Sequence, residues 1–117
     1  MSERDCIFCR IISGELSADY IYQDERAVAI RDINPQAPTH VLVMPRQHIA
    51  SLADMTEEQA PFLGHLALVA NQVAKLEGID ATGYRVITNV GPDSGQAVRH
   101  LHFHVLGGRH LGRLVSQ

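Results

Sequence analysis

The sequence predicts an α+β fold, with an antiparallel sheet of about five strands, one short helix and one long helix. Short apolar-rich runs follow one another through brief polar turns, which is typical of antiparallel hairpins. One segment, residues 55–78, changes to the period of an amphipathic helix, and there is no regular strand–helix crossover pattern. A chain of 117 residues is long enough for one hydrophobic core and too short for two, so residues 1–117 are expected to form a single domain.

The first half of the chain predicts one helix and three strands. Residues 6–13 (CIFCRIIS) space their apolar side chains as a short helix does, and Gly14 ends it. Two apolar-rich runs, YIYQ at 20–23 and AVAIRDI at 27–33, flank the polar residues DER and predict a hairpin. The turn NPQAPT then leads into a strand, HVLVMP, which ends at Pro45.

The second half predicts the long helix. Thr56 and Gln59 form a capping-box pattern at its start, and Pro61 makes the helix regular only from about residue 60. Gly78 ends the helix. An apolar stripe along one face consists of Phe62, Leu66, Val69, Val73 and Leu76.

Composition and charge narrow the range of functions. The net charge is −3, with no basic run and no tryptophan, so binding of duplex or single-stranded nucleic acid has little electrostatic basis, whereas a free small nucleotide is not excluded. No apolar segment approaches the roughly 20 residues that span a bilayer, and the polar start MSERD lacks the layout of a signal peptide. We therefore expect a soluble cytoplasmic protein without a membrane or nucleic-acid partner.

Three histidines at alternate positions are the most unusual feature of the sequence. A strand at 83–90 (GYRVITNV) and a glycine loop at 91–96 (GPDSGQ) precede His100, His102 and His104, which alternate with apolar residues. In a strand, these imidazoles would line one face, roughly 7 Å apart, and the apolar residues would enter a core. Such a face suits an oxyanion or a metal ion; alternatively it is a solvated face that is rich in histidine.

The loop before the histidines favours a phosphate ligand. Glycines such as Gly91 and Gly95 let main-chain N–H groups turn toward an anion, although Gly-Pro and Ser-Gly also occur in ordinary turns. Neutral imidazole attacks phosphorus and imidazolium donates to phosphate oxygens, and a pKa near 6.5 makes both forms accessible at neutral pH. The loop and the histidines together indicate phosphoryl or nucleotidyl transfer.

The sequence resembles the histidine triad family of nucleotide hydrolases and transferases, in its Hint-type branch. The resemblance rests on HLHFHVL at 100–106, on DINPQAPTHVLVMPRQHI upstream and on the surrounding GQAVRHLHFHVLGGR, and it covers about residues 6–110. It implies a hydrolase that cleaves purine nucleoside 5′-phosphoramidates, conjugates of AMP or GMP, through a covalent nucleotidyl-histidine. It also implies a homodimer in which two sheets pair across the long helix and one strand.

The resemblance assigns roles to three histidines. The middle histidine of the triad is the family's nucleophile, which corresponds to His102. His104 matches the third position, which contacts phosphate oxygens and helps to orient the nucleophile. His40 of the PTH motif would be the neighbour of His104. Donors aimed at the charge that develops on phosphorus would supply most of the stabilisation.

The resemblance also implies a nucleotide-binding site. Asp32 matches an acidic residue that binds the ribose hydroxyls; alternatively it caps a turn. The positions that contact phosphate match Asn89 and the main chain of Gly95 and Gln96. The apolar slot that holds the purine matches five residues that alternatively belong to the core: Ile7, Phe8, Ile11, Ile33 and Leu42.

The only two cysteines gain a role from the same resemblance. Cys6 and Cys9 have a two-residue spacing, which in a reducing compartment suggests metal or redox chemistry before a structural disulfide. With His48 and His100 they resemble the set that binds zinc in some bacterial members of the family. Two thiolates and two imidazoles form a closed site, so this zinc would be structural and none would be required for catalysis. Alternatively, the cysteines are free buried thiols beside an ordinary histidine face.

Three alternatives to the phosphoramidase remain open from the sequence. A dinucleoside polyphosphate hydrolase uses the same chemistry. A nucleotide-binding regulatory module with vestigial catalysis is conceivable because Ala97 stands where many relatives carry a serine or threonine hydroxyl that reaches the leaving group. A metalloenzyme with three histidine ligands leaves the glycine loop and the DINPQAPTH motif unexplained.

Overall fold

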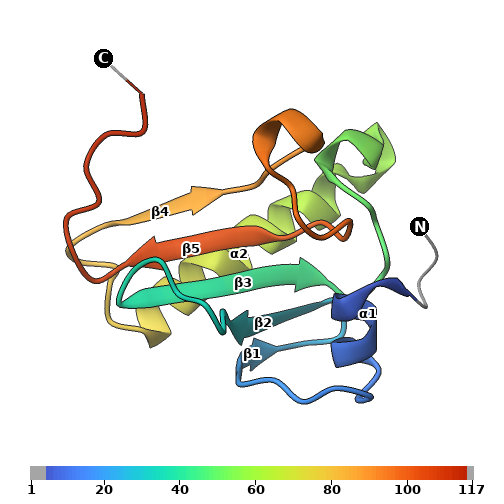
Figure 1. The fold of residues 1–117 in the computed structure, drawn as a ribbon, viewed down its shortest axis with the longest axis horizontal. Helices are drawn as coiled ribbons and strands as arrows, with labels where there is room; N and C mark the ends of the chain where they lie inside the picture. The colour runs from blue at the N-terminus through green and yellow to red at the C-terminus, as the bar shows by residue number, and fades with distance from the viewer. Residues whose placement is uncertain (1–4, 116–117) are drawn as a thin grey trace.

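The structure of the chain, a computed structural model, describes residues 5–115 and has the predicted α+β architecture (Figure 1). The elements are α1 (Ile7–Ile12), β1 (Tyr20–Gln23), β2 (Ala27–Arg31), β3 (Thr39–Pro45), α2 (Ala60–Leu76), β4 (Tyr84–Ile87) and β5 (Phe103–Gly107). The strands form one antiparallel sheet in the order β1-β2-β3-β5-β4. Within the described residues, no helix combines the length and apolarity that a membrane span requires.

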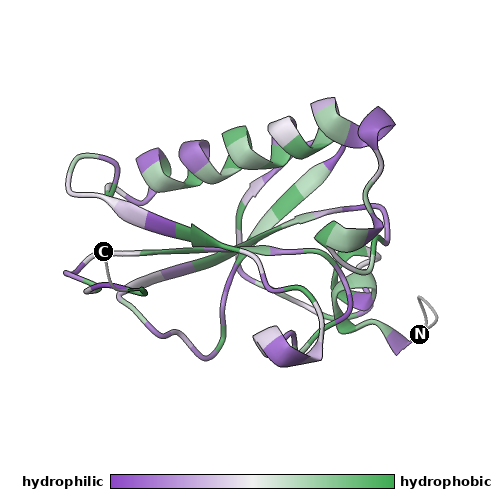
Figure 2. Cartoon of the chain, turned by 90° about the horizontal axis from the view of Figure 1, so that it is seen from above, coloured by the Kyte–Doolittle hydropathy of each residue, from purple (hydrophilic) through white to green (hydrophobic). Residues whose placement is uncertain are grey.

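Strands β2 and β3 separate two hydrophobic cores. Helix α2 lies along one face of the sheet (Figure 2), and Ala29 and Val43, which pair with each other, face it. Their neighbours Ile30 and Leu42, which also pair, belong to the second core, next to α1. Alternate side chains of a strand point to opposite faces, so burial on both sides explains the continuous apolar runs at residues 27–30 and 41–45 in these central strands.

The start of α2 follows its capping signal. The main-chain N–H of Thr56 donates to Gln59 Oε1 over 2.9 Å, and a 3-10 turn at Glu57–Gln59 leads into the helix at Ala60. The predicted apolar stripe is only partly buried, because Leu76 in the last turn is 56% exposed. The buried face of the helix consists of Leu66, Val69, Ala70, Val73 and Ala74.

The histidine segment departs from the prediction. Strand β5 begins at Phe103, so the expectation that His100 and His102 lie in a strand is wrong. Leu101 and Val105 nevertheless enter the core beside α2, as the alternation predicts. His100 is fully buried and does not line an open face.

Competing hydrogen bonds explain why the strand starts late. The neighbouring strand β3 ends at Pro45, which has no N–H, and the Pro45 carbonyl accepts a bond from His100 Nε2–H over 2.8 Å. The carbonyl of His102 accepts a bond from the Thr88 hydroxyl over 2.8 Å. Side chains thus donate to carbonyl groups that would accept main-chain hydrogen bonds if β5 began earlier.

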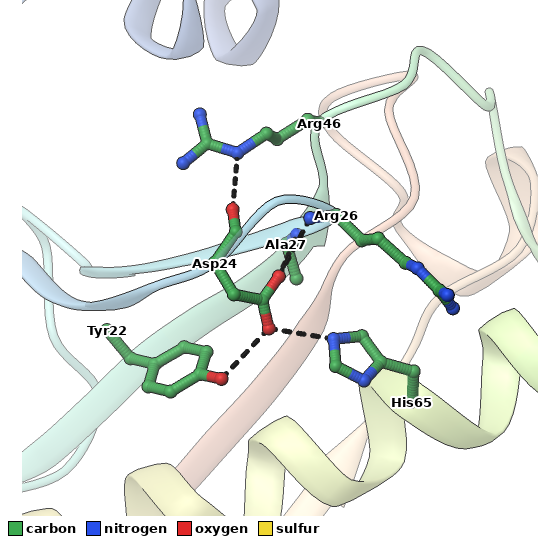
Figure 3. Close-up of polar contacts among 6 residues, drawn as sticks. All are labelled: Tyr22, Asp24, Arg26, Ala27, Arg46 and His65. Atoms are coloured by element: carbon green, nitrogen blue, oxygen red, sulfur yellow. Dashed lines mark hydrogen bonds and ion pairs between the residues drawn. The ribbon is translucent and has the colours of Figure 1, made fainter.

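Asp24, in the turn between β1 and β2, joins three elements (Figure 3). Its carboxylate and main-chain oxygens accept hydrogen bonds from Tyr22, Arg26 N, Ala27 N, His65 and Arg46. Because His65 lies on α2 and Arg46 follows β3, these bonds tie the hairpin to both. Burial alone would raise the pKa of Asp24, but the hydrogen bonds outweigh it and lower the pKa to about 2.

Candidate active site and metal centre

Two of the predicted catalytic histidines contact each other across neighbouring strands. His40 lies on β3 and His104 on β5, where His104 pairs with Leu42, so both imidazoles lie on the α1 side of the sheet. His40 Nε2 lies 2.9 Å from His104 Nδ1. Asp32 Oδ2 lies 3.4 Å from the same His40 nitrogen. The fold therefore brings His40 beside His104, as the resemblance implies, and it also places Asp32 next to His40.

One main-chain group determines which nitrogens of this pair carry protons. The N–H of Gln36 donates to His40 Nδ1 over 3.0 Å, so neutral His40 carries its proton on Nε2. That proton is donated to His104 Nδ1, so neutral His104 carries its own proton on Nε2. Burial, together with the positive charge that His102 and His40 can carry, lowers the pKa of His104 to about 4. At pH 7 the pair therefore presents an N–H donor at His104 Nε2.

His102 has its proton on the other ring nitrogen. Its Nδ1–H donates to the carbonyl oxygen of His100 over 2.6 Å, which leaves a lone pair on Nε2. The residue is 7% exposed, and this burial lowers the pKa of His102. Its ring centroid lies 5.0 Å from that of His104 and 5.1 Å from that of Phe8, which packs edge-on. The site thus places an unprotonated imidazole nitrogen beside an imidazole N–H donor.

The two cysteines and two further histidines form a second cluster close to His102. Cys6 Sγ caps α1 by accepting a bond from the N–H of Cys9. His100 Nδ1 lies 3.3 Å from Cys6 Sγ and 3.5 Å from Cys9 Sγ. His48 Nδ1 lies 3.1 Å from Cys9 Sγ. The four possible ligand atoms all lie within 4.8 Å of one another.

The geometry and protonation of this cluster suit a tetrahedral zinc ion. Zinc–sulfur bonds of about 2.3 Å and zinc–nitrogen bonds of about 2.05 Å separate N and S ligands by about 3.5 Å, close to the separations in the cluster. The Nε2–H of His100 donates to Pro45, so Nδ1 is the nitrogen available to a metal. A hydrogen bond of this kind ordinarily orients a metal-bound histidine. His100 can therefore bind zinc through Nδ1 while its ring proton stays on Nε2.

A second group of possible ligands has a different character. Asp32, His40 and His104 also bring three ligand atoms within 4.8 Å. A metal on His40 Nε2 would require the ring proton on Nδ1, where the N–H of Gln36 already donates. The 2.9 Å between the two imidazole nitrogens also matches an N–H···N bond better than the roughly 3.3 Å between two nitrogens on one tetrahedral ion. The Gln36 N–H, His40 and His104 instead form a series of hydrogen bonds, the histidine relay.

The predicted nucleotide-binding residues occupy different environments. Asp32 Oδ1 accepts a bond from the N–H of Asn34 over 2.8 Å, so the turn-capping interpretation is confirmed, and a ribose contact stays a prediction. In the apolar slot, Ile7 is 46% and Ile33 is 99% exposed. The other three predicted slot residues, Phe8, Ile11 and Leu42, are buried in the core next to α1. Contact of all five with a base stays a prediction.

The glycine loop is held largely by its own hydrogen bonds. The main-chain N–H groups of Gly95 and Gln96 donate to Pro92 and Gly91 over 3.0 and 3.3 Å. The Gln96 side chain also braces the loop, since it accepts a bond from the N–H of Gly91 and donates to the carbonyl of Ala50. Contact of the Gly95 and Gln96 N–H groups with phosphate stays a prediction. It requires these N–H groups to leave the carbonyls of Pro92 and Gly91 and to donate to the phosphate. Asn89 is half-buried just before the loop.

Sequence reasoning missed two main-chain groups that organise the site. The Pro45 carbonyl fixes the ring of His100, and the Gln36 amide fixes the proton of His40. Nearly every residue has a main-chain N–H and carbonyl, so residue type does not reveal which of these groups will contact a site. The only signal was position, since Pro45 ends a predicted strand and Gln36 lies in the predicted turn before His40.

Comparison with known proteins identifies the family of the chain. The HIT domain model matches residues 13–111. The chain is 44% identical over 112 residues to a purine nucleoside phosphoramidase of Escherichia coli K12, covering 96% of this chain and 94% of that protein. It is 44% identical over 113 residues to a 14 kDa zinc-binding protein of Zea mays, covering 95% and 88%.

A solved structure extends the comparison to the fold. The HIT family hydrolase of Clostridium thermocellum superposes with a TM-score of 0.92 at 47% identity, covering 96% of this chain and 97% of that one. The matched range of the family model, residues 13–111, includes His40, His102 and His104. The chain belongs to the HIT family.

Proposed function

We propose that the chain is a nucleotide hydrolase that cleaves purine nucleoside 5′-phosphoramidates through a covalent nucleotidyl-His102. The observation that carries the proposal is the unprotonated His102 Nε2 beside the N–H donor of His104. The 44% identity to a purine nucleoside phosphoramidase supports the phosphorus–nitrogen bond as the one that is cleaved.

The reaction takes two displacements at the α-phosphorus. In the first, the lone pair of His102 Nε2 forms a bond to phosphorus, the bond from phosphorus to the amine nitrogen breaks, and the amine leaves after taking up a proton. In the second, water attacks the same phosphorus, gives up a proton, and releases the nucleoside monophosphate and free His102. The net change is the addition of one water molecule.

Hydrogen bonds around His102 support both steps. Burial lowers the pKa of His102, which keeps the nucleophile neutral at pH 7. When its ring becomes positively charged on bonding phosphorus, the bond from Nδ1–H to the His100 carbonyl strengthens. The N–H of His104 Nε2 donates to a phosphate oxygen as negative charge develops there. His40 is the positioning partner of His104.

The predicted recognition residues complete the proposed site. Asp32 Oδ2, beside His40, accepts bonds from the ribose hydroxyls, and Asn89 with the glycine loop contacts the phosphate. The base lies against exposed Ile7 and Ile33, with the buried slot residues beneath them.

A structural zinc ion is part of the proposal. Cys6, Cys9, His48 and His100 hold it, and when bound it cross-links the start of α1 to the segment that carries His102. The similarity to a zinc-binding protein supports this ligand set. Thiolate ligands also support a reducing, cytoplasmic location.

A homodimer built from one HIT domain per chain, residues 1–117, is also proposed. Leu68 and Leu76 on α2 are 66% and 56% exposed, and Val86 on the edge strand β4 is 42% exposed. Apolar side chains this exposed on a helix and a sheet edge suit burial against a second copy. Light scattering on the purified protein checks the dimer, and Leu68→Glu is expected to shift it toward monomer.

The activity is tested by release of AMP from adenosine 5′-phosphoramidate, with a dinucleoside polyphosphate assayed in parallel. Wild type and the control His110→Ala, an exposed histidine outside the site, are expected to turn over with and without a chelator. His102→Ala is expected to lose turnover and still bind AMP. If neither wild type nor His102→Ala turns over while both bind AMP, the chain is a nucleotide-binding module and the proposal is wrong.

The metal site is tested separately by elemental analysis. Wild type is expected to contain about one zinc per chain, and the Cys6→Ala Cys9→Ala variant none. A metal-free wild type with the same thermal stability as the double variant would overturn the zinc assignment and leave the hydrolase proposal standing.

A further inference from the structure

Gln36 lies at the outer end of the histidine relay, and Arg109 holds it there. Residues 32–38 belong to neither helix nor strand. At the start of this turn the N–H of Asp32 donates to the His40 carbonyl, and the Gln36 side chain donates to the Asn34 carbonyl over 3.1 Å. Arg109 Nη2–H donates to the Gln36 carbonyl over 3.1 Å, while the N–H of Gln36 donates to His40 Nδ1 over 3.0 Å. Gln36 is thus held on both sides, by a side chain that follows β5 and by a catalytic-site histidine.

The chain path after β5 delivers Arg109 to this place. Gly107 pairs with Thr39, and Gly108 then has a φ of +93°. A Cβ on Gly108 would lie 2.9 Å from Pro38 Cβ, so only glycine combines this backbone conformation with so close an approach. The turn therefore passes over Pro38 and brings Arg109 to the carbonyl two residues earlier.

Removing the Gln36 donor would reverse the direction of the whole relay. If His40 Nδ1 took the ring proton, His40 Nε2 would become an acceptor for a proton on His104 Nδ1. His104 Nε2 would then present a lone pair to the phosphate oxygens in place of an N–H. The chemistry of the site therefore depends on an amide that touches no substrate.

We propose that Arg109 is a positioning residue, which sets the tautomers of His40 and His104 by holding the Gln36 amide. This rests on the proposed function for its effect on rate, but the tautomers themselves exist with or without catalysis. The guanidinium suits the task because it also donates to the His110 carbonyl over 3.0 Å, which fixes its own orientation.

Variants of the exposed Arg109 side chain test the proposal with little risk to folding. Arg109→Met is expected to lower kcat about three- to tenfold with little change in KM, because the relay favours the productive tautomer less strongly. Arg109→Lys, whose ammonium can still donate to the Gln36 carbonyl but lacks the planar fork of the guanidinium, is expected to recover part of the loss. Arg113→Met, an exposed arginine further along the chain, is the matched control and is expected to equal wild type.

The decisive readout is ¹⁵N NMR of the histidine rings in the zinc-containing protein as purified. In wild type, His40 and His104 are expected to be protonated on Nε2, and Arg109→Met is expected to add the Nδ1 tautomer at both. Gln36→Pro, which removes the N–H, is expected to reverse both tautomers, whereas Gln36→Ala keeps the amide and the wild-type tautomers.

The outcomes separate this inference from the proposed function. If wild type does not hydrolyse the phosphoramidate but the tautomers shift as expected, the positioning role stands and the hydrolase proposal fails. Unchanged tautomers and unchanged kcat in Arg109→Met overturn the positioning role, whatever the activity of wild type. An unfolded Gln36→Pro variant leaves the decision to the Arg109 series.

Discussion

Replacing Asp24 with asparagine tests how the turn between β1 and β2 stabilises the fold. The asparagine side chain would keep one oxygen for the main-chain N–H groups of Arg26 and Ala27, but its amide NH₂ would face the donors of Tyr22 and His65. The two bonds that the carboxylate accepts from Tyr22 and His65, 2.9 and 2.8 Å long, would be lost, and the neutral NH₂ would only donate in their place to the Tyr22 oxygen or to an unprotonated His65 Nε2. We expect Asp24→Asn to lower the free energy of unfolding at pH 7 by about 1–2 kcal/mol.

The pKa of Asp24 gives an independent upper limit on the contribution of its carboxylate to the free energy of unfolding. It also determines how that contribution changes with pH. A fall from 3.8 to about 2 corresponds to about 2.5 kcal/mol, and solvent screening at a side chain that is 24% exposed reduces it. Because the folded-state pKa is the lower one, this stabilisation is present in full above pH 3.8. It is lost as the pH falls through about 2.

Urea denaturation at pH 7 and pH 2.5 measures the effect. The difference between wild type and Asp24→Asn is expected to be smaller at pH 2.5, provided that both remain folded there. Asp19→Asn is the control, because Asp19 pairs with Arg31 at 3.2 Å but is 70% exposed, and a change below about 0.5 kcal/mol is expected. An Asp24→Asn variant as stable as wild type at pH 7 would refute the reasoning.

Three further predictions concern the core, the relay and the leaving group. Leu66→Ala, at a fully buried position on α2, is expected to lower the free energy of unfolding, measured by urea denaturation, by about 2–5 kcal/mol. Leu68→Ala, at an exposed position, is expected to change the free energy of unfolding by less than about 0.5 kcal/mol at low protein concentration. Stability is expected to fall as the pH drops from 6.5 to about 4, because the unfolded chain binds a proton that folded His104 does not. His104→Gln should flatten that slope, and an unchanged slope would contradict the low pKa. Ala97→Ser is expected to raise kcat for phosphoramidates of weakly acidic amines about tenfold through one added donor to the leaving group, and equal steady-state rates would refute this.

Strong periodic signals predicted the fold well, and local competition for hydrogen bonds explains where they failed. The capping box, the α2 start and the β1–β2 hairpin follow the sequence closely. The runs predicted as strands at 27–33 and 83–90 are shorter, at Ala27–Arg31 and Tyr84–Ile87. In the first, the Asp32 carboxylate forms a turn with Asn34. Periodicity cannot show such a bond, because it counts only apolar positions.

The site was predictable as a set of residues but not as an arrangement of protons. The resemblance to the histidine triad family named the members of two clusters, and the fold brings the side chains of each cluster close together. Only the three-dimensional structure shows that the His100 carbonyl accepts a bond from His102, while the His100 ring donates to Pro45 and lies against the cysteines. The exposure of Ile33 was equally invisible, since an apolar residue after a strand is ordinarily interpreted as a core position.

The position of β5 has a consequence for how the protein is made. β5 is the last of the five strands to be synthesised, yet it lies between β3 and β4, and β4 is at the edge with β5 as its neighbour. A growing chain therefore has unpaired strand edges until residues 103–107 emerge, and long-range closure of this kind is slow. The same pairing sets His104 beside His40. A nascent chain would thus acquire its proposed catalytic pair only on completing its sheet, and chains stalled before β5 would be prone to aggregation and would lack the proposed activity.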